Sequence, residues 1–234
     1  MEKPTIMKLN VLTRHGAIAA ARRRLPRRVH DPLTRAVLLF SGAGIIGLAV
    51  AMLVHARLGL APFDVLVSSV SSHSGLSMGQ SAWMISGSLY LVSTLLGRRP
   101  SLVSLAFITA TGLAVDTMIP LVADLDAMPL RIGAMVTGVA LLSLGVAMVV
   151  HSSATGGSFE LLMKAGQDRG LRPARVRMFL ESSALLTGTL TGGAFGVGTV
   201  VVALSMGHLM QFWLAVLDRS SRARGVRVLV PVAR

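Results

Sequence analysis

Four carboxylates lie within or beside apolar segments of this chain, where an ionised side chain is costly. Asp64 and Glu160 each follow a phenylalanine in a short segment, and Asp116 and Glu181 lie inside longer apolar stretches. Ionisable side chains inside a membrane commonly bind a proton, an ion or a charged substrate. We therefore consider all four acids candidates for lining a substrate or ion pathway.

Each acid also has a plainer interpretation. Asp116 stands near the end of its stretch that would face outside, where water would reach it. Arg177 precedes Glu181 by four residues, so the two share a helical face and would form an interfacial ion pair. Asp64 and Glu160 fall in the first turn of short predicted helices, where free N–H groups favour a carboxylate without any ligand.

Three histidines and a glutamine are further polar candidates. His55 and His151 end two of the apolar stretches, where they could shuttle protons or contact interfacial water. His208 and Gln211 are three residues apart in the last stretch and therefore share a helical face. That pair could line a polar path or form hydrogen bonds with neighbouring helices.

The composition excludes several classes of protein. Of the 234 residues, 53% are hydrophobic and only 14% are charged, and the mean hydropathy is +0.69. These values are typical of a polytopic membrane protein rather than a soluble domain. The sequence contains no cysteine and no zinc-protease, serine-hydrolase or nucleotide-binding motif. We therefore expect no enzyme activity, no catalytic residue, no metal and no cofactor, and any transport would be of the secondary type.

Six apolar stretches have lengths suited to membrane-spanning helices, at residues 36–54, 81–97, 102–123, 132–150, 176–191 and 197–217. With both termini in the cytoplasm, 21 of the 23 Lys and Arg residues lie inside, and only Arg57 and Arg131 lie outside. The positive-inside rule therefore supports six spans. The net charge of +13 gathers in two basic tails, 1–35, expected to be disordered, and 218–234. We expect these tails to contact anionic lipids and not nucleic acid.

The two halves of the chain resemble each other in sequence. Residues 51–55 read Ala-Met-Leu-Val-His and residues 147–151 read Ala-Met-Val-Val-His, an offset of 96 that becomes 95 after one deletion. Repeat one, 36–123, and repeat two, 132–217, each hold three predicted spans. Because three is an odd number, the second repeat must enter the membrane from the opposite side.

A short segment follows the first span of each repeat, at residues 58–73 and 154–168. Each segment is too short to cross a bilayer and suits a re-entrant or interfacial helix. The predicted fold is therefore an all-α membrane protein. Its six transmembrane helices form two inverted three-helix repeats, each with one short re-entrant or interfacial helix.

One motif points to a known family. Residues 59–64 read Gly-Leu-Ala-Pro-Phe-Asp, and residues 74–79 read Ser-Gly-Leu-Ser-Met-Gly. Over residues 38–217 the chain resembles the YczE/YitT-like family of bacterial integral membrane proteins. The resemblance implies a duplicated, multi-span inner-membrane protein of a kind often described as a permease without an assigned substrate. The second repeat departs from the motif, with Ser158 and Glu160 where the first has proline and aspartate.

These observations predict a secondary-type permease for a small molecule or ion in the bacterial inner membrane. Six spans would barely enclose a pathway, so a homodimer is one arrangement to consider. The alternative is a membrane protein that transports nothing and scaffolds or regulates a partner protein. An intramembrane enzyme ranks last, because the sequence shows no catalytic constellation.

Overall fold

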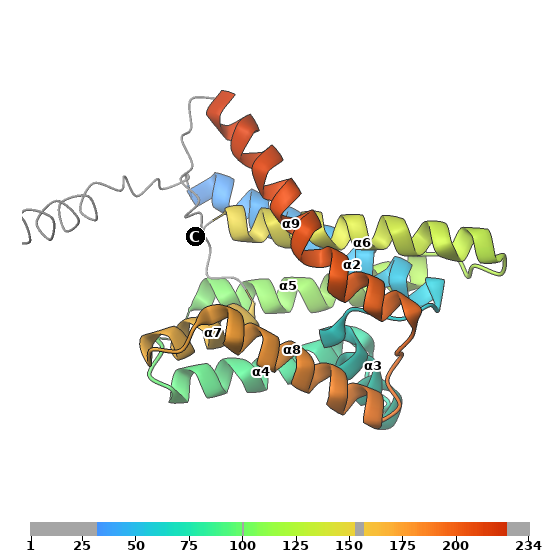
Figure 1. Ribbon diagram of the computed structural model, residues 1–234, viewed down its shortest axis with the longest axis horizontal. Helices are drawn as coiled ribbons and strands as arrows, with labels where there is room; N and C mark the ends of the chain where they lie inside the picture. Colours follow the sequence, from blue (N-terminus) through green and yellow to red (C-terminus); the bar gives the residue numbers. More distant parts are fainter. Residues whose placement is uncertain (1–31, 100, 153–156, 224–234) are drawn as a thin grey trace, which may run out of the picture. The chain divides into compact units, whose positions relative to one another are not determined.

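The computed structural model describes residues 32–99, 101–152 and 157–223, which form helices without any strand. The helices are α2 (Pro32–Ala56), α3 (Pro62–Ser74), α4 (Met78–Leu95), α5 (Leu102–Met118), the 3-10 helix η1 (Ile119–Leu121), α6 (Met128–His151), α7 (Ser158–Asp168), α8 (Pro173–Leu190) and α9 (Val197–Ala223) (Figure 1). The chain divides into two compact units, His30–Leu217 and the two chain ends. Only residues 218–223 of the second unit are described, so the account below concerns the first.

Four helical segments are long and apolar enough to cross a membrane: Pro32–Ala56, Leu102–Leu121, Met128–His151 and Val197–Arg219. The predicted spans 81–97 and 176–191 are helical, as α4 and α8, but neither helix meets the same criterion. Serines dilute the apolar character of α4, and α8 carries two arginines and a glutamate. The described residues are therefore all-helical and include four candidate spans, where the sequence predicted six.

Helix ends differ from the predicted boundaries at both termini. The N-terminal tail was predicted to reach residue 35, but α2 already begins at Pro32. The C-terminal tail was predicted to begin at residue 218, but α9 continues to Ala223. The predicted spans were uncharged stretches, so they left out the first turn of α2 and the last turns of α9, which carry arginine. A helix accepts arginine readily where it extends beyond the hydrocarbon core of the membrane. The remaining tail residues, 1–31 and 224–234, lie outside the described part of the chain.

The two short segments form short helices, as predicted. α3 has 13 residues and α7 has 11, so neither could cross a bilayer. Pro62 occupies the first turn of α3, where its missing N–H is no loss. Gly75 ends the same helix in a left-handed conformation (φ 69°), which a glycine adopts without strain. Residues 154–156 of the second predicted segment lie outside the described ranges.

Helices α2 and α6 lie side by side and run antiparallel (Figure 1). A Cβ atom placed on Gly42 would lie 3.0 Å from the carbonyl oxygen of Gly145, and one on Gly138 would lie 3.2 Å from that of Ala49. Small residues thus let the two backbones approach closely. Gly42 and Gly138 are 96 residues apart, and so are Ala49 and Gly145. The second contact therefore pairs the positions equivalent to those of the first, with α2 and α6 in exchanged roles.

The remaining contacts are only partly alike in the two halves. α3 and α7 each pack against both α4 and α8, and α5 packs against α2 and α4. α9, which takes the place of α5 in the predicted repeat, makes only slight contacts with the other described helices. Only 6% of the residues in its apolar stretch are buried, against 28% in the stretch Leu102–Leu121 that contains α5. The third helix of the second half is therefore far more exposed than its counterpart.

Two connecting segments from opposite halves meet where α9 begins. The Gly198 N–H donates to the Leu58 carbonyl at 2.7 Å, and a Cβ atom on Gly196 would lie 2.3 Å from that same oxygen. Gly59 faces them with a φ of 121°, a conformation that other residues rarely adopt. Glycines are therefore required at this junction because the two backbones touch.

Candidate functional site

A cavity of about 490 Å³ lies among the helices of the unit His30–Leu217. All eight described α-helices contribute residues to its lining, most of them apolar. Its volume falls within the range of roughly 300–1,000 Å³ that is typical of small-molecule sites. Among the candidate acids, Asp64, Glu160 and Glu181 line it, and Arg177 lines it beside them.

The lining residues follow the offset that relates the two halves of the sequence. Twenty-six of the 28 lining residues form thirteen pairs that are 96 or 95 residues apart. The pairs are Ile46/Leu142, Val50/Val146, Ala61/Gly157, Pro62/Ser158, Phe63/Phe159, Asp64/Glu160, Ala82/Arg177, Ser86/Glu181, Phe107/Val202, Ile108/Ala203, Thr111/Met206, Gly112/Gly207 and Val115/Met210. Only Val149 and Met163 lack their counterpart in the lining. Both halves of the chain therefore present the same positions to one cavity.

The first turns of α3 and α7 meet at this cavity. Phe63 and Phe159 pack edge to face, with ring centroids 5.2 Å apart and ring planes at 77°. This arrangement matches the preferred geometry of aromatic pairs. Each ring immediately precedes an acid, so the contact brings together the first helical turns that carry Asp64 and Glu160.

Asp64 is the acid whose surroundings most favour a ligand. Asp64 is half-buried, and no hydrogen bond or ion pair to its carboxylate occurs among the described residues. Burial raises the pKa of the Asp64 carboxyl from 3.8 to about 7. Since a charge buried without a partner is costly, the group is poised to bind a proton or a positively charged ligand.

Arg177 and Glu181 form the predicted ion pair. The arginine Nε donates to the glutamate Oε1 at 2.8 Å, and each side chain is 38% exposed. Both residues also line the cavity, which the interfacial interpretation did not anticipate. Their counterparts in the first half are Ala82 and Ser86, so this pair of charges lies on one side of the cavity only.

Asp116 lies outside the cavity lining and stabilises the start of α4. Its Oδ2 accepts a hydrogen bond from the Ser77 hydroxyl at 2.6 Å, and its Oδ1 accepts one from the Gly79 N–H at 2.7 Å. Ser77 also forms a capping box with Gln80. The carboxylate thus satisfies a helix terminus, and we assign Asp116 to that structural role rather than to a pathway.

His55 belongs to a polar cluster at the end of α2. Its Nδ1 lies 3.1 Å from Asp124 Oδ1, and its Nε2 lies 2.9 Å from the Ile119 carbonyl. The Arg57 guanidinium donates to the same Asp124 oxygen at 3.1 Å, and Arg131 donates to the Arg57 carbonyl at 2.9 Å. The two basic residues predicted to lie outside therefore meet at one end of the molecule. Asp124, the partner of His55 and Arg57, did not stand out in the sequence.

The three remaining candidates also lie away from the cavity lining. His151 is buried at the end of α6. His208 and Gln211 are exposed on α9, and the His208 Nδ1 lies 3.4 Å from the Leu204 carbonyl within the same helix. Of the eight candidate residues, the structure thus brings together Asp64, Glu160 and Glu181 in one cavity.

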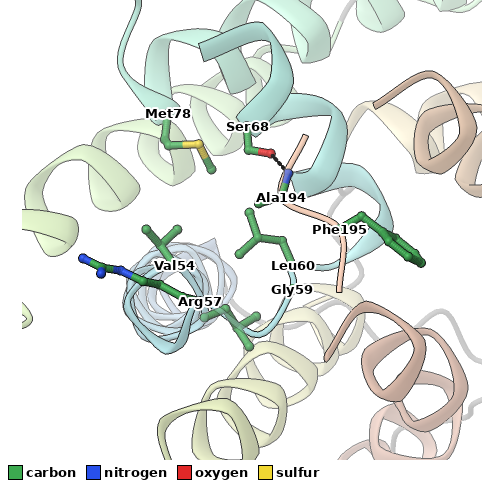
Figure 2. A pocket seen from close by; sticks show the side chains of 9 residues that line it. Val54, Arg57, Gly59, Leu60, Ser68, Met78, Ala194 and Phe195 are labelled. Atoms are coloured by element: carbon green, nitrogen blue, oxygen red, sulfur yellow. Dashed lines mark hydrogen bonds between the residues drawn. The ribbon is translucent and has the colours of Figure 1, made fainter. Parts of the chain in front are cut away.

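A second, smaller pocket of about 270 Å³ lies beside the glycine junction (Figure 2). Figure 2 shows the Ser68 hydroxyl pointing to the backbone N–H of Ala194, from which it accepts a hydrogen bond at 2.9 Å. Arg57, which also lines this pocket, is already paired with Asp124. Because its hydroxyl and guanidinium are engaged with protein, the pocket is a weaker candidate than the larger cavity.

No group of three His, Cys, Asp or Glu side chains in the described ranges is close enough to hold a metal ion. The three acids are therefore distributed around the cavity rather than gathered at one point. The arrangement can accommodate a ligand with an apolar body between them, and its carboxylates can exchange protons or bind positive charge.

Apolar helices of spanning length around a charged cavity define a multi-pass membrane protein. The chain belongs to a family of unknown function, DUF6198, whose model matches residues 33–215. This match, together with the relatives described next, confirms the resemblance to YczE-like proteins.

Three curated bacterial proteins are similar to the chain. An uncharacterized protein of Haemophilus influenzae is 30% identical over 80% of this chain and 85% of its own length. The uncharacterized membrane protein YczE of Bacillus subtilis is 28% identical, over 75% of this chain and 83% of its own. The uncharacterized protein YyaS of Bacillus subtilis is 23% identical, over 77% and 94% respectively. No solved structure matches the chain.

Proposed function

We propose that the chain is a secondary-type permease for a small molecule or ion and that the 490 Å³ cavity is its binding site. The observation that carries the proposal is the paired lining of this cavity. Many secondary transporters are built from inverted repeats and bind substrate near the bilayer midplane where the repeats meet. A cavity lined by equivalent positions of both halves is what such a site requires.

The proposal includes six membrane-crossing helices in two inverted repeats. The antiparallel, reciprocal contacts of α2 and α6 support the inversion, as does the meeting of Phe63 with its counterpart Phe159. α4 and α8 would then cross the bilayer with their polar residues turned to the cavity or to other helices, as intramembrane polar residues generally are. α3 and α7 would enter as re-entrant or interfacial helices.

The proposal also includes an orientation in the bacterial inner membrane. Both termini would be cytoplasmic, with the basic tails against anionic lipids and the cluster of Arg57 and Arg131 outside. No nucleotide-binding motif is present in the sequence, so transport would draw on an ion or substrate gradient. The proposal assigns no catalytic step to the chain.

A cavity-filling variant tests the proposal. Gly207 lines the cavity, and a Cβ atom there would meet no other atom within 4 Å. Gly207→Phe should therefore fill the cavity without disturbing the packing. Leu204 is 72% exposed on the same helix and is absent from the lining, which makes Leu204→Phe the matched control.

The measurement is substrate-dependent proton flux in sealed proteoliposomes that are offered a mixed metabolite pool. We expect the wild type and Leu204→Phe to carry flux above empty liposomes and Gly207→Phe to fall to that background. Flux that survives in Gly207→Phe would argue against this cavity as the pathway. Absence of flux in folded wild-type protein would instead favour the scaffold or regulator.

A further inference from the structure

We infer that the cavity binds an organic cation, a compound with one positive charge on an apolar or aromatic body. The inference rests on the proposed permease function and names the substrate class of the same site. It combines three features of the lining: the charges of its ionisable residues, the separation of its acids, and the aromatic contact between Phe63 and Phe159.

The charges of the lining favour a cation over an anion. The ionisable residues in it are Asp64, Glu160, Glu181 and Arg177, so acids outnumber bases by three to one. Arg177 is bonded to Glu181 at 2.8 Å and therefore offsets that carboxylate. Asp64 and Glu160 are the other two acids of the lining, and no hydrogen bond or ion pair to the Asp64 carboxylate occurs among the described residues. An anion entering this space would be repelled in a medium that screens charge poorly.

The spacing of the acids favours an organic cation over a bare metal ion. A hard metal cation needs several oxygen ligands converging on one point. In the described part of the chain no three acidic or histidine side chains are grouped closely enough to provide them. An organic cation needs only one or two carboxylates near its charge, while its body replaces the remaining water.

The apolar part of the lining fits the body of such a ligand. Phe63 and Phe159 pack against each other at the cavity that Asp64 and Glu160 also line, and Phe107 lines it from α5. Aromatic rings stabilise a nearby cation through their π faces. Most other lining residues are aliphatic or methionine, which adapts to varied shapes.

Two hydrophobic ions of the same shape and opposite charge test the inference. Tetraphenylphosphonium is the cation and tetraphenylborate is the matched anion. Binding of each to the purified full chain in neutral detergent is measured by equilibrium dialysis, with protein-free micelles as the blank. We expect saturable binding of the phosphonium and none of the borate.

Matched variants assign the binding to the cavity. Asp64→Asn should weaken phosphonium binding by roughly tenfold, since it removes a charge that no protein group offsets. Asp64→Glu should retain most of the binding. Asp126→Asn removes an exposed carboxylate outside the lining and should leave binding unchanged. If Asp64→Asn does not fold, Glu160→Gln and the comparison of the two probes still decide the question.

The inference is overturned if the borate binds as tightly as the phosphonium, or if folded Asp64→Asn and Glu160→Gln both bind the phosphonium like the wild type. Its failure can be told apart from failure of the permease proposal. Flux that depends on Gly207, without phosphonium binding, would leave a permease with another substrate class. If neither Gly207-dependent flux nor phosphonium binding is observed, both proposals fail.

Discussion

The two halves of the chain supply the same positions to the cavity but different side chains. On the side of α4 the lining has Ala82 and Ser86, and on the side of α8 the matching places hold Arg177 and Glu181. Both halves thus contribute one acid, Asp64 or Glu160, whereas the pair of opposite charges, Arg177 and Glu181, occurs in the second half alone. A symmetric scaffold with an asymmetric lining can treat a ligand differently on its two faces.

The third helices of the two halves differ in packing as well. α5 lies against α2 and α4, whereas α9 makes only slight helix contacts in the described structure. Gly112 and Gly207 show the difference at one pair of positions, since the first is enclosed and the second faces open space. The comparison indicates that α5 is held by packing against its neighbours and that α9 is held much less.

The largest expected effect comes from adding a methyl group to each of these glycines. A Cβ atom at Gly112 would lie 2.1 Å from the Trp83 Nε1, so Gly112→Ala should lower the free energy of unfolding by about 1–3 kcal/mol. Gly207→Ala should be neutral or stabilising by up to about 1 kcal/mol, because alanine favours helix more than glycine does. Thermal unfolding in detergent measures both, and equal losses would contradict the packing difference.

A somewhat smaller effect is expected at the next matched pair, Asp116 and Gln211. Asp116→Ala removes two hydrogen bonds at the start of α4, to Ser77 and Gly79, and should cost about 1–2 kcal/mol of stability. Gln211→Ala changes an exposed side chain on α9 and should alter stability by less than about 0.5 kcal/mol. Chemical unfolding of both variants tests this. Asp116→Ala with wild-type stability would show that the cap is unimportant.

The asymmetric lining is tested by replacing Arg177 and Glu181 with alanine and serine, the residues at the matching places of the first half. Arg177→Ala should tighten phosphonium binding by about three- to tenfold, and Glu181→Ser should weaken it similarly, because they remove charges of opposite sign. The double variant should bind near the wild-type level. Equilibrium dialysis measures all three. Changes of the same direction in both single variants would mean that the pair acts through packing instead of charge.

The smallest expected effect is the pH dependence of binding. The Asp64 carboxyl, with its pKa raised to about 7, is neutral below that pH and charged above it, so affinity for a cation should rise with pH. Between about pH 6.5 and 7.5 its charged fraction rises about threefold, and phosphonium affinity should follow.

Glu160, Glu181 and Arg177 line the same cavity and could contribute to this profile. Asp64→Asn separates their contribution from that of Asp64, and it should flatten the rise around pH 7. Phosphonium dissociation constants measured across this range in the wild type and the variant provide the test. A wild-type profile without any rise, or a rise that persists in Asp64→Asn, would contradict the assignment to Asp64.

The helices could largely be predicted from the sequence because apolar stretches and breaking residues mark them. Both short helices were expected from segments too short to cross, and the turn at Gly75 follows from glycine chemistry. Whether α4 and α8 cross the bilayer could not be settled by counting, since serine and charge dilute them. A polar helix can still be covered by its neighbours, and the pattern of one helix does not reveal that.

The candidate site was predictable only in part. Asp64 and Glu160 stand out because each follows a phenylalanine at positions 96 residues apart, and both line the cavity. The sequence did not reveal the partner of Asp116, because Ser77 lies 39 residues away and only the fold brings the two together. For Glu181 the sequence favours an interfacial ion pair, because spacing along one helix does not reveal whether its face turns inward.

The contact between the two connecting segments has a consequence for how the chain is made. The Leu58 carbonyl receives its hydrogen bond from Gly198, which follows it only after most of the chain has been synthesised. During insertion, the Leu58 carbonyl therefore lacks its partner in the finished structure until the start of the last helix arrives. A chain truncated before the glycine junction would leave the early helices inserted yet unable to complete their assembly.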